Sequence, residues 1–363
     1  MNPRERMLCA LTPGNKADRV PVTIHQWQPY HLKKYLNNMS DLEAFQWFGL
    51  DAAIPAFLIS IPDTPHWRFS REEPRVTPSK TRLTRCRVET PGGTLAWLEE
   101  ADEATTWVKE FPIKKKEDIL LFKNYCPTPE LDIKALNAVR DKVGDHGILR
   151  GFIWGDQGGP WQHACCLYDL QNLILATFDD PAWVHEFMRI LTDIKLRFIE
   201  AHMKGAPYDL VETGGGAGSS TCVSPGLFEE FLLPYDRELH RALHGQGQKV
   251  VYHTCGGMMP ILELIVQNEC DVAETLTPPE IGGDARPAEL KARIGDKVAL
   301  IGGINQHTIL TSGSTEEVRA HVRATFEAYG VDGGYTLSPS DHFFETPLEN
   351  IKAYAEAGRD CTY

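Results

Sequence analysis

A histidine and a cysteine stand two residues apart, as His253 and Cys255, directly after the run 249–252 and before two glycines. Residues two apart in an extended strand point to the same side, so an imidazole nitrogen and a thiolate there could bind one metal ion. The glycines let the backbone turn sharply beside them. On its own the pair is more typical of a buried cysteine beside a hydrogen-bonded histidine, so further ligands must support the metal interpretation.

A second group of residues suited to chemistry follows the run 334–337. Asp341, His342 and Glu345 are all residue types that bind metals or transfer protons. If both runs are strands of one parallel barrel, their carboxyl ends lie at the same face, and these side chains join the first pair. Helix capping by Ser340 or Asp341 is the alternative.

A single acidic residue, Glu212, follows the run 209–211 and precedes three glycines that begin at Gly214. The glycines could cradle a phosphate, but the phosphate-loop lysine and the dinucleotide spacing are missing. A flexible loop at the barrel mouth, with Glu212 as a metal ligand or a base, is better supported.

The residues His25, Gln26, Trp27 and Gln28 come after the first apolar run, 20–24. An imidazole, an indole and two amides are suited to holding a polar aromatic or sugar-like ligand. A plain surface loop is the alternative. We expect these side chains to line the substrate side of the pocket, opposite the metal.

Eight short apolar runs, most of them followed by a helical pattern, must position these groups. Two segments, 181–202 and 315–329, have apolar residues at helical spacing, and Ser314 to Glu317 gives the second a start signal. Eight strands alternating with helices predict a parallel (β/α)₈ barrel, whose active site lies at the carboxyl ends of its strands. The runs are Val20–Ile24, Ala52–Phe57, Ile148–Ile153, Asp209–Glu212, Lys249–His253, Asp271–Ala273, Lys297–Ile301 and Gly334–Leu337.

One region, 81–113, departs from this alternation. It reads as antiparallel strands at 81–89, 94–99 and 105–110, with a proline-glycine-glycine turn at 91–93. We interpret it as a β-hairpin insertion between the second and third barrel strands, as a lid or a contact in a homodimer. The stretch 114–129 should return to the barrel through a short helix.

Composition excludes several classes of protein. The 363 residues carry 37 basic and 50 acidic side chains, a net charge of −13, which gives no electrostatic footprint for nucleic acid or an anionic membrane. No run reaches the length of a membrane span, and Arg4, Glu5 and Arg6 argue against a signal peptide. Nine scattered cysteines are typical of reduced thiols, so we expect a cytoplasmic protein with one domain, 1–363.

Stretches along the whole chain, taken together, resemble the uroporphyrinogen decarboxylase superfamily. The resemblance implies a (β/α)₈ barrel, in agreement with the alternation of strands and helices. Asn305 lies in one of these stretches and joins Gly214 as a candidate for substrate binding. The stretches are Pro3–Leu11, Asp18–Val22, Gly151–Phe152, Gly158–Trp161, Pro225–Tyr235, Tyr252–Gly257, Gly302–Asn305 and Thr346–Ile351.

The decarboxylase branch of that superfamily carries an arginine-bearing loop, Arg-Gln-Ala-Gly-Arg in type, after the first strand. That loop binds the carboxylates of the porphyrinogen. The same position here runs from His25 to Pro29 and has no arginine. Because a polycarboxylate needs cationic partners, the sequence argues against porphyrinogen decarboxylation, which remains the alternative together with a non-catalytic binding barrel.

The other branch comprises cobalamin-dependent methyltransferases, which include methylcobalamin:coenzyme M methyltransferases. Resemblance to this branch implies zinc bound by His253, Cys255 and a downstream cysteine, but that last position falls at Ser340, beside Asp341 and His342. Either a neighbour replaces the thiolate, or zinc is not retained. Fewer thiolates leave a harder zinc, better suited to O- or N-methyl compounds than to a thiol.

These arguments combine into one hypothesis for the site. The metal ligands are His253, Cys255 and a third from Asp341, His342 or Glu212, with Glu212 and Asp341 also as catalytic candidates. The chain has no Asp-x-His-x-x-Gly corrinoid motif, so the cobalamin should be supplied by a separate corrinoid protein. The resemblance implies methyl transfer between that corrinoid and a small O-, N- or S-methyl compound, or a thiol or folate acceptor.

Overall fold

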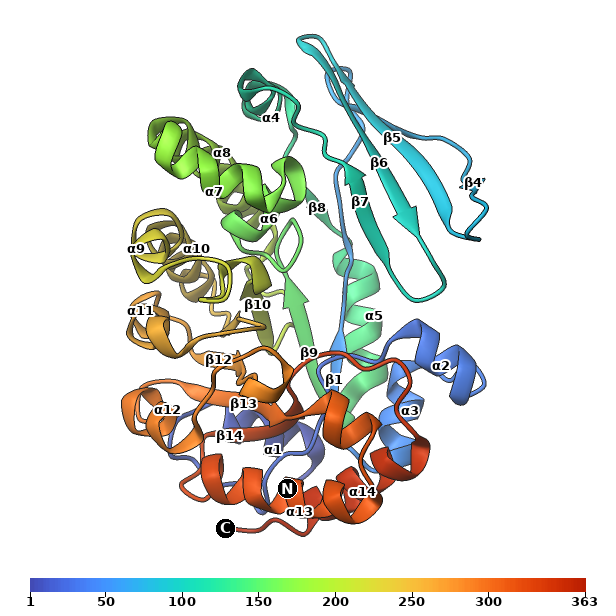
Figure 1. Ribbon diagram of the computed structural model, residues 1–363, viewed down its shortest axis with the longest axis vertical. Helices are drawn as coiled ribbons and strands as arrows, with labels where there is room; N and C mark the ends of the chain where they lie inside the picture. The colour runs from blue at the N-terminus through green and yellow to red at the C-terminus, as the bar shows by residue number, and fades with distance from the viewer.

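A curled sheet of seven parallel strands forms the centre of the computed structural model, which describes all of residues 1–363 (Figure 1). The strands follow one another in chain order, with helices outside them. Most of these strand residues are buried, because helices cover the outer face and side chains fill the inner one. The strands are β1 (Ala52–Pro55), β9 (Gly147–Phe152), β10 (Leu210–Gly214), β11 (Val250–His253), β12 (Val272–Thr275), β13 (Ala299–Ile304) and β14 (Tyr335–Pro339).

The eighth predicted strand, 20–24, is reduced to a single parallel bridge between Val22 and Leu337 of β14. Backbone hydrogen bonds still connect this segment to both edges of the sheet. The Leu337 amide donates to the Pro21 carbonyl at 2.9 Å, and the Asp51 amide donates to the Val22 carbonyl at 2.8 Å. Pro21 has no amide hydrogen to donate, which limits the ladder at this point.

Fourteen α-helices connect and cover the strands. Two have the predicted bounds, and the side chains of Ser314 and Glu317 form a reciprocal cap at the start of α13. Within these 363 residues no helix has the length and apolar character that a membrane crossing requires. The helices are α1 (Pro3–Ala10), α2 (Pro29–Tyr35), α3 (Asp41–Phe48), α4 (Ile119–Tyr125), α5 (Ile133–Val143), α6 (Pro160–Tyr168), α7 (Leu170–Asp179), α8 (Pro181–His202), α9 (Pro225–Leu227), α10 (Leu233–Gly245), α11 (Leu262–Gln267), α12 (Pro287–Ile294), α13 (Thr315–Tyr329) and α14 (Leu348–Arg359).

Short 3₁₀ and π segments complete the connections. The 3₁₀ segments are η1 (Lys116–Asp118), η2 (Gly144–His146), η3 (Gly216–Gly218), η5 (Met259–Ile261) and η6 (Pro279–Ile281). The π segments are η4 (Phe228–Leu232) and η7 (Gln306–Thr311).

An antiparallel sheet lies beside α4, at the top of Figure 1, between β1 and β9 in the chain. Its longest pair, β5 with β6, turns between Thr90 and Gly93. The sheet is larger than the predicted 81–113 segment, because two strands before residue 81 also pair with β5. Its strands are β3 (Arg68–Arg71), β4 (Arg75–Val76), β5 (Arg82–Thr90), β6 (Gly93–Ala101) and β7 (Thr106–Glu110), and a separate pair joins β2 (Ile59–Ser60) to β8 (Glu130–Leu131).

Candidate functional site

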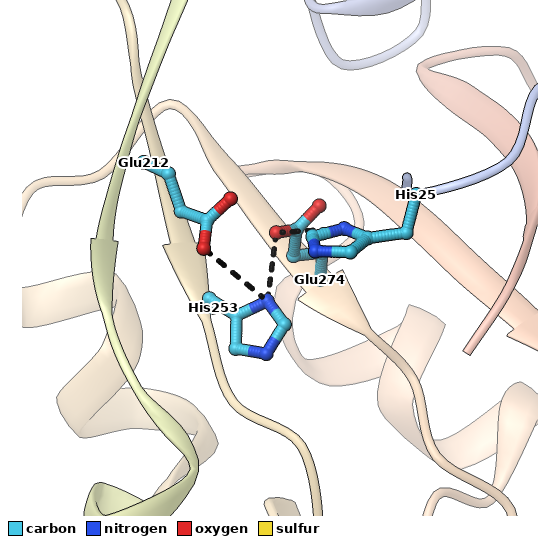
Figure 2. A group of neighbouring side chains, drawn as sticks. All are labelled: His25, Glu212, His253 and Glu274. Carbon is cyan, nitrogen blue, oxygen red and sulfur yellow. Dashed lines mark hydrogen bonds and ion pairs between the residues drawn. The ribbon is translucent and has the colours of Figure 1, made fainter. Parts of the chain in front are cut away.

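Four buried side chains converge on one point inside the curled sheet. Glu212 lies on β10, His253 ends β11, Glu274 lies on β12, and His25 comes from the segment before α2. His253 is directly opposite Glu274 in the parallel ladder. None of the four is more than 8% exposed, and Figure 2 shows them pointing toward one another. The topology therefore brings together groups that are far apart in the sequence.

A buried arginine on β9, Arg150, holds the two carboxylates of this cluster. Its guanidinium donates to Glu212 Oε2 and to Glu274 Oε1, each at 2.6 Å, and lies 3.1 Å from His25 Nδ1. Burial opposes ionisation of Glu274, but the charges of Arg150 and His25 hold the pKa of that carboxyl well below its ordinary value. Sequence analysis missed Arg150 and Glu274, and a lone arginine inside the apolar run 148–153 was the available signal.

His253 connects this buried cluster to a second group of ligand atoms. Its Nδ1 lies 2.9 Å from Glu274 Oε1 and 3.9 Å from Glu212 Oε1, while its Nε2 is buried with no hydrogen-bond partner. Burial disfavours the imidazolium, but contacts with Cys255 and Glu274 raise the pKa of His253 well above its ordinary value. The ring therefore sits in an environment that favours positive charge, whether from a proton or from a cation.

The second group consists of His253, Cys255 and Asp341, whose ligand atoms lie within 4.8 Å of one another. Cys255 and Asp341 are half-buried. His342 is not part of this group, although its Nε2 lies 3.7 Å from Asp341 Oδ1. Glu212 belongs instead to the four-residue cluster, whose ligand atoms also lie within 4.8 Å of one another and whose two carboxylates already share Arg150. Of the three candidates for a third ligand, Asp341 has the best position.

The loop after the first predicted strand contributes one residue to the site. The ring of His25 lies 5.1 Å from the ring of His253 and 5.0 Å from that of His342, measured between centroids. It is therefore beside the candidate metal ligands, in contrast to the predicted position opposite them. Gln26 and Gln28 are half-buried, and Gln28 precedes the first turn of α2 without a side-chain cap.

Trp27, predicted to line the substrate pocket, lies in the core. It is 1% exposed, and its indole stacks on Phe48 and meets Phe45 and Phe343 edge-on. An apolar ring of this size gains more from burial among other rings than from a place at a polar site. The structure thus gives Trp27 a packing role that accounts for its position, and its predicted contact with the substrate stays a prediction.

Two other candidates occupy structural positions. The carboxamide oxygen of Asn305 accepts hydrogen bonds from the His307 and Thr308 amides, which caps η7. This capping role accounts for the carboxamide oxygen, and substrate binding by Asn305 stays a prediction. Glu345 lies on the surface and pairs with Lys34 at 2.8 Å, away from the ligand group.

The glycines after β10 are required by close packing. Gly214 has a φ of +88°, and a Cβ atom there would lie 2.6 Å from the His253 carbonyl oxygen. At Gly216 a Cβ atom would lie 2.5 Å from Cys255 Sγ. The glycine run thus lets the chain pass directly against the thiol, which accounts for it without the predicted mobile loop.

Comparison with known proteins shows the family of this chain. Residues 104–361 match the family profile described as uroporphyrinogen decarboxylase (URO-D). The chain belongs to the uroporphyrinogen decarboxylase family. The matched segment includes Arg150, Glu212, His253 and Asp341, whereas His25 precedes it.

Curated relatives from two branches of the family have nearly the same identity to this chain. Methylcobamide:CoM methyltransferase MtaA of Methanosarcina barkeri is 29% identical over 248 residues, 67% of this chain and 66% of the relative. Uroporphyrinogen decarboxylase of Aliivibrio salmonicida is 28% identical over 269 residues, 68% of this chain and 69% of the relative. The chain thus matches about two thirds of each relative, and both relatives are enzymes.

A solved structure agrees over the whole chain. A methyltransferase from Methanosarcina mazei superposes with a TM-score of 0.70 and covers 99% of both chains. At 19% identity this likeness concerns the fold, and it agrees with a curled α/β sheet of the barrel type.

Proposed function

We propose that this chain is a zinc-dependent methyltransferase. It would move a methyl group between a small O-, N- or S-methyl compound, or a thiol or folate acceptor, and the corrinoid of a separate protein. The observation that carries the proposal is His253, whose buried Nε2 has no hydrogen-bond partner and whose ligand atoms lie within 4.8 Å of those of Cys255 and Asp341.

The donor set fits zinc. Imidazole, thiolate and carboxylate are all zinc ligands, and catalytic zinc keeps three protein ligands and one open position. The hydrogen bond of His253 Nδ1 to Glu274 is the second interaction typical of a metal-binding histidine, because it fixes the ring and its tautomer. Zinc bound there would act as a Lewis acid that lowers the pKa of a bound thiol or stabilises an alkoxide or phenolate leaving group.

The protein groups around these ligands have separate roles in this proposal. Glu274 orients His253, and Arg150 holds the carboxylates of Glu274 and Glu212 in place through hydrogen bonds. His25 lies at the same site and is the candidate for contact with the substrate. A single thiolate makes the donor set harder than one with two thiolates, which favours an O- or N-methyl compound as the substrate.

The site offers little to a porphyrinogen decarboxylase. Arg150 is the cation of the buried cluster, and both of its carboxylate partners are already bound at 2.6 Å. It is therefore not free for the carboxylates of a tetrapyrrole, which each need a cationic partner.

The first experiment is elemental analysis of the full chain, purified without added metal. We expect about one zinc per chain, and loss of that zinc in Cys255→Ser. The control is Cys9→Ser, which changes a half-buried thiol on α1 and should leave the zinc content unchanged. Equal zinc contents in the two variants would contradict the assignment of Cys255 as a ligand.

The second experiment tests the reaction. The protein is mixed with free cob(I)alamin and a panel of methoxylated aromatics, methylamines and methyl thiols, and the methylcobalamin spectrum is followed. The reverse direction is run with thiol and folate acceptors. Full activity of Cys255→Ser would overturn the proposal. Decarboxylation of a porphyrinogen would also overturn it, if no compound of the panel supports methyl transfer even when corrinoid proteins are added.

A further inference from the structure

A cavity of about 460 Å³ lies between the antiparallel sheet and the parallel barrel, and the proposed methyl transfer does not use it. Val88, Leu95 and Trp97 line it from the antiparallel sheet, and Phe122 of α4 lines it from the other side. Its volume falls in the range of small-molecule sites, which are concave and mostly apolar with a few polar groups.

The walls of the cavity are aromatic rings in fixed contact with their neighbours. Trp97 stacks against Phe69 with the two planes 29° apart, and Phe122 lies 5.4 Å from Trp67. Such rings offer flat apolar surfaces, which prefer other planar rings in stacked or edge-on arrangements. The walls thus favour a planar aromatic occupant over a flexible chain.

One polar ring, His163 of α6, completes the lining. It is 7% exposed, and its Nδ1 is buried against Gly155 with no hydrogen-bond partner, which leaves Nε2 as the ring nitrogen available to a ligand. Trp154 holds the ring edge-on at 4.4 Å, and the ammonium of Lys195 donates to the Trp154 carbonyl behind it. Burial, and then the nearby Lys195, keep the pKa of His163 well below its ordinary value, so the ring is neutral.

A neutral imidazole in an apolar cavity selects a neutral ligand. It can exchange one hydrogen bond with a hydroxyl or a carbonyl, but it cannot compensate the desolvation of a carboxylate. Besides His163, the lining has one hydroxyl group, that of Ser60. No charged side chain lines the cavity. A carboxylate or a phosphate should therefore be excluded.

We propose that this cavity is a binding site for a small, uncharged, planar aromatic molecule with one hydrogen-bonding oxygen, of the phenol type. The ring packs between Trp97 and Phe122, and the oxygen exchanges a hydrogen bond with His163. The site does not depend on the proposed methyl transfer, because its residues are separate from the candidate metal ligands.

The cavity nevertheless adjoins the barrel mouth. It shares Trp154 with a smaller hollow of about 220 Å³ that Gln157 also lines. The side chain of Gln157 accepts a hydrogen bond from the Gly216 amide at 3.2 Å, and Gly216 lies against Cys255. The cavity is thus connected to the candidate metal ligands through Trp154, Gln157 and Gly216.

The probe is 2-naphthol, titrated into the full chain by isothermal calorimetry, with naphthalene and 2-naphthoate as matched ligands. One hydrogen bond to a buried group should make 2-naphthol bind about tenfold tighter than naphthalene, and 2-naphthoate should bind more weakly still. His163→Phe keeps a ring in place and should reduce the preference for 2-naphthol over naphthalene to within about threefold.

A second variant locates the binding. Leu95→Trp places an indole in the cavity and should weaken 2-naphthol binding at least about tenfold, because it occupies the volume of the ligand ring. Val76→Trp is the control, since Val76 lies on the same sheet, is 73% exposed and does not line the cavity. Thermal melts check that each variant is folded.

The outcomes separate this inference from the proposed function. Binding of 2-naphthol that survives Cys255→Ser and is lost in Leu95→Trp supports the cavity even if no methyl transfer is found. Unchanged affinity in folded Leu95→Trp, tighter binding of 2-naphthoate, or no binding at about 1 mM 2-naphthol would overturn it.

Discussion

One imidazole, that of His253, joins the two halves of the candidate site. Its Nδ1 faces the buried carboxylate of Glu274, its Nε2 has no hydrogen-bond partner, and the ring lies within 4.8 Å of the ligand atoms of Cys255 and Asp341. Since a hydrogen-bonded carboxylate makes the ring a stronger and better oriented ligand, the buried half of the site prepares the half that would hold the metal. Arg150 extends this arrangement, because it fixes the carboxylate that fixes the ring.

The first prediction concerns this positioning. Glu274→Gln keeps the size of the side chain but removes its charge, so zinc affinity should fall about 10- to 100-fold while the protein stays folded. Glu212→Gln is the matched control, because it removes the same charge from Arg150 but lies 3.9 Å from His253 Nδ1. Competition with a chromophoric chelator measures both affinities. Equal losses in the two variants would mean that the effect passes through Arg150 alone.

A second prediction follows from the buried position of Trp27. Trp27→Ala removes a 1% exposed indole from an aromatic cluster and should lower the free energy of unfolding by about 3–5 kcal/mol, with the zinc content of the folded protein unchanged. Trp47→Ala, at a 68% exposed position on α3, should change it by less than about 0.5 kcal/mol. Urea denaturation compares the two. Weaker substrate binding by Trp27→Ala, with an unchanged free energy of unfolding, would indicate that Trp27 lines the pocket.

The sequence predicts some residues of the site better than others. His253, Cys255 and Asp341 are metal-ligand types at the ends of predicted strands, so topology alone brings them together. Arg150 was missed because it lies inside the apolar run 148–153, and Glu274 was missed because the predicted strand 271–273 stops one residue short of it. A charge inside a strand acquires its partner only when the barrel curls, and no local pattern contains that information.

At the scale of elements, one buried histidine connects a strand, a helix and a loop. His240 of α10 is fully buried, with Nδ1 2.7 Å from the Asn268 carbonyl and Nε2 2.8 Å from the Thr213 hydroxyl of β10. Its Nδ1 therefore donates to that carbonyl. Burial lowers the pKa of His240 to about 4, because a charged ring would lose its solvation, and the hydrogen bond to the Asn268 carbonyl offsets only part of that loss.

The third prediction is a dependence of stability on pH. The pKa of His240 is lower in the folded chain than the ordinary 6.5, so its contribution is complete above pH 6.5 and is lost as the pH falls from 6.5 toward 4. That loss should approach about 3 kcal/mol. His240→Gln should lose less stability than the wild type between pH 7 and pH 4.5 in urea denaturation. His244→Gln, on the same helix but partly exposed, is the control, and equal losses in all three proteins would contradict the prediction.

Most elements follow from local patterns, and the exceptions have physical causes. Helices α8 and α13 have the predicted bounds because an aspartate or serine cap and a continuous apolar stripe both mark them. Strands β3 and β4 were missed, since their side chains are exposed and have no apolar alternation to indicate a strand. Their pairing with β5 supplies the structure that their own sequence does not specify.

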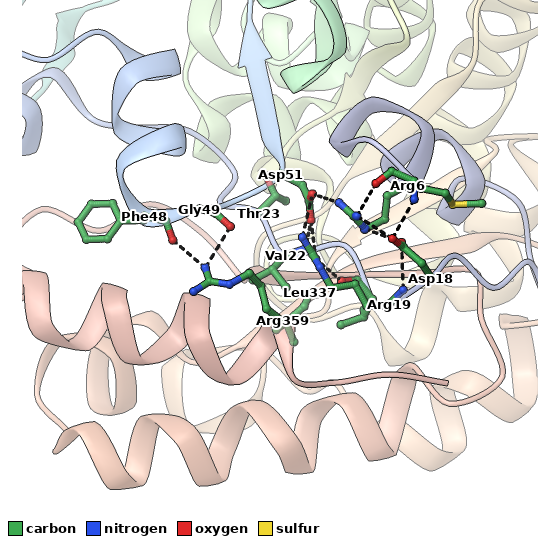
Figure 3. A network of polar contacts seen from close by, with 12 residues as sticks. Arg6, Asp18, Arg19, Val22, Thr23, Phe48, Gly49, Asp51, Leu337 and Arg359 are labelled. Carbon is green, nitrogen blue, oxygen red and sulfur yellow. Dashed lines mark hydrogen bonds and ion pairs between the residues drawn. The ribbon is translucent and has the colours of Figure 1, made fainter.

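At the scale of the whole molecule, the two ends of the chain close the sheet. Figure 3 shows a polar network in which the buried Asp51, just before β1, accepts hydrogen bonds from Arg6, Arg19 and the Val22 amide. In the same view Arg359 of α14 donates to the carbonyls at the end of α3. Because the bridge at Val22 is short, these side chains take over part of the cohesion that a full strand pair would give.

The network gives a fourth prediction, on the closure of the barrel. Asp51→Asn removes the only carboxylate partner of Arg19 and one of the two partners of Arg6, which keeps Asp18, and should lower the free energy of unfolding by about 3–5 kcal/mol. Its effect on hydrogen exchange should be local. The amides of Thr23 and Leu337, which hydrogen-bond across the seam beside Val22, should exchange faster relative to the amides of β11.

Asp209 provides the matched control. Its carboxylate also accepts hydrogen bonds from two arginines, Arg4 and Arg140, and from the backbone amide of Leu149. Asp209→Asn therefore removes the same charge from a similar arrangement. Asp209 directly precedes β10 and lies away from the seam. We expect a comparable loss of stability without selective exchange at Thr23 and Leu337. If both variants accelerate exchange uniformly over the sheet, the seam has no separate stability, and the barrel opens only when the whole chain unfolds.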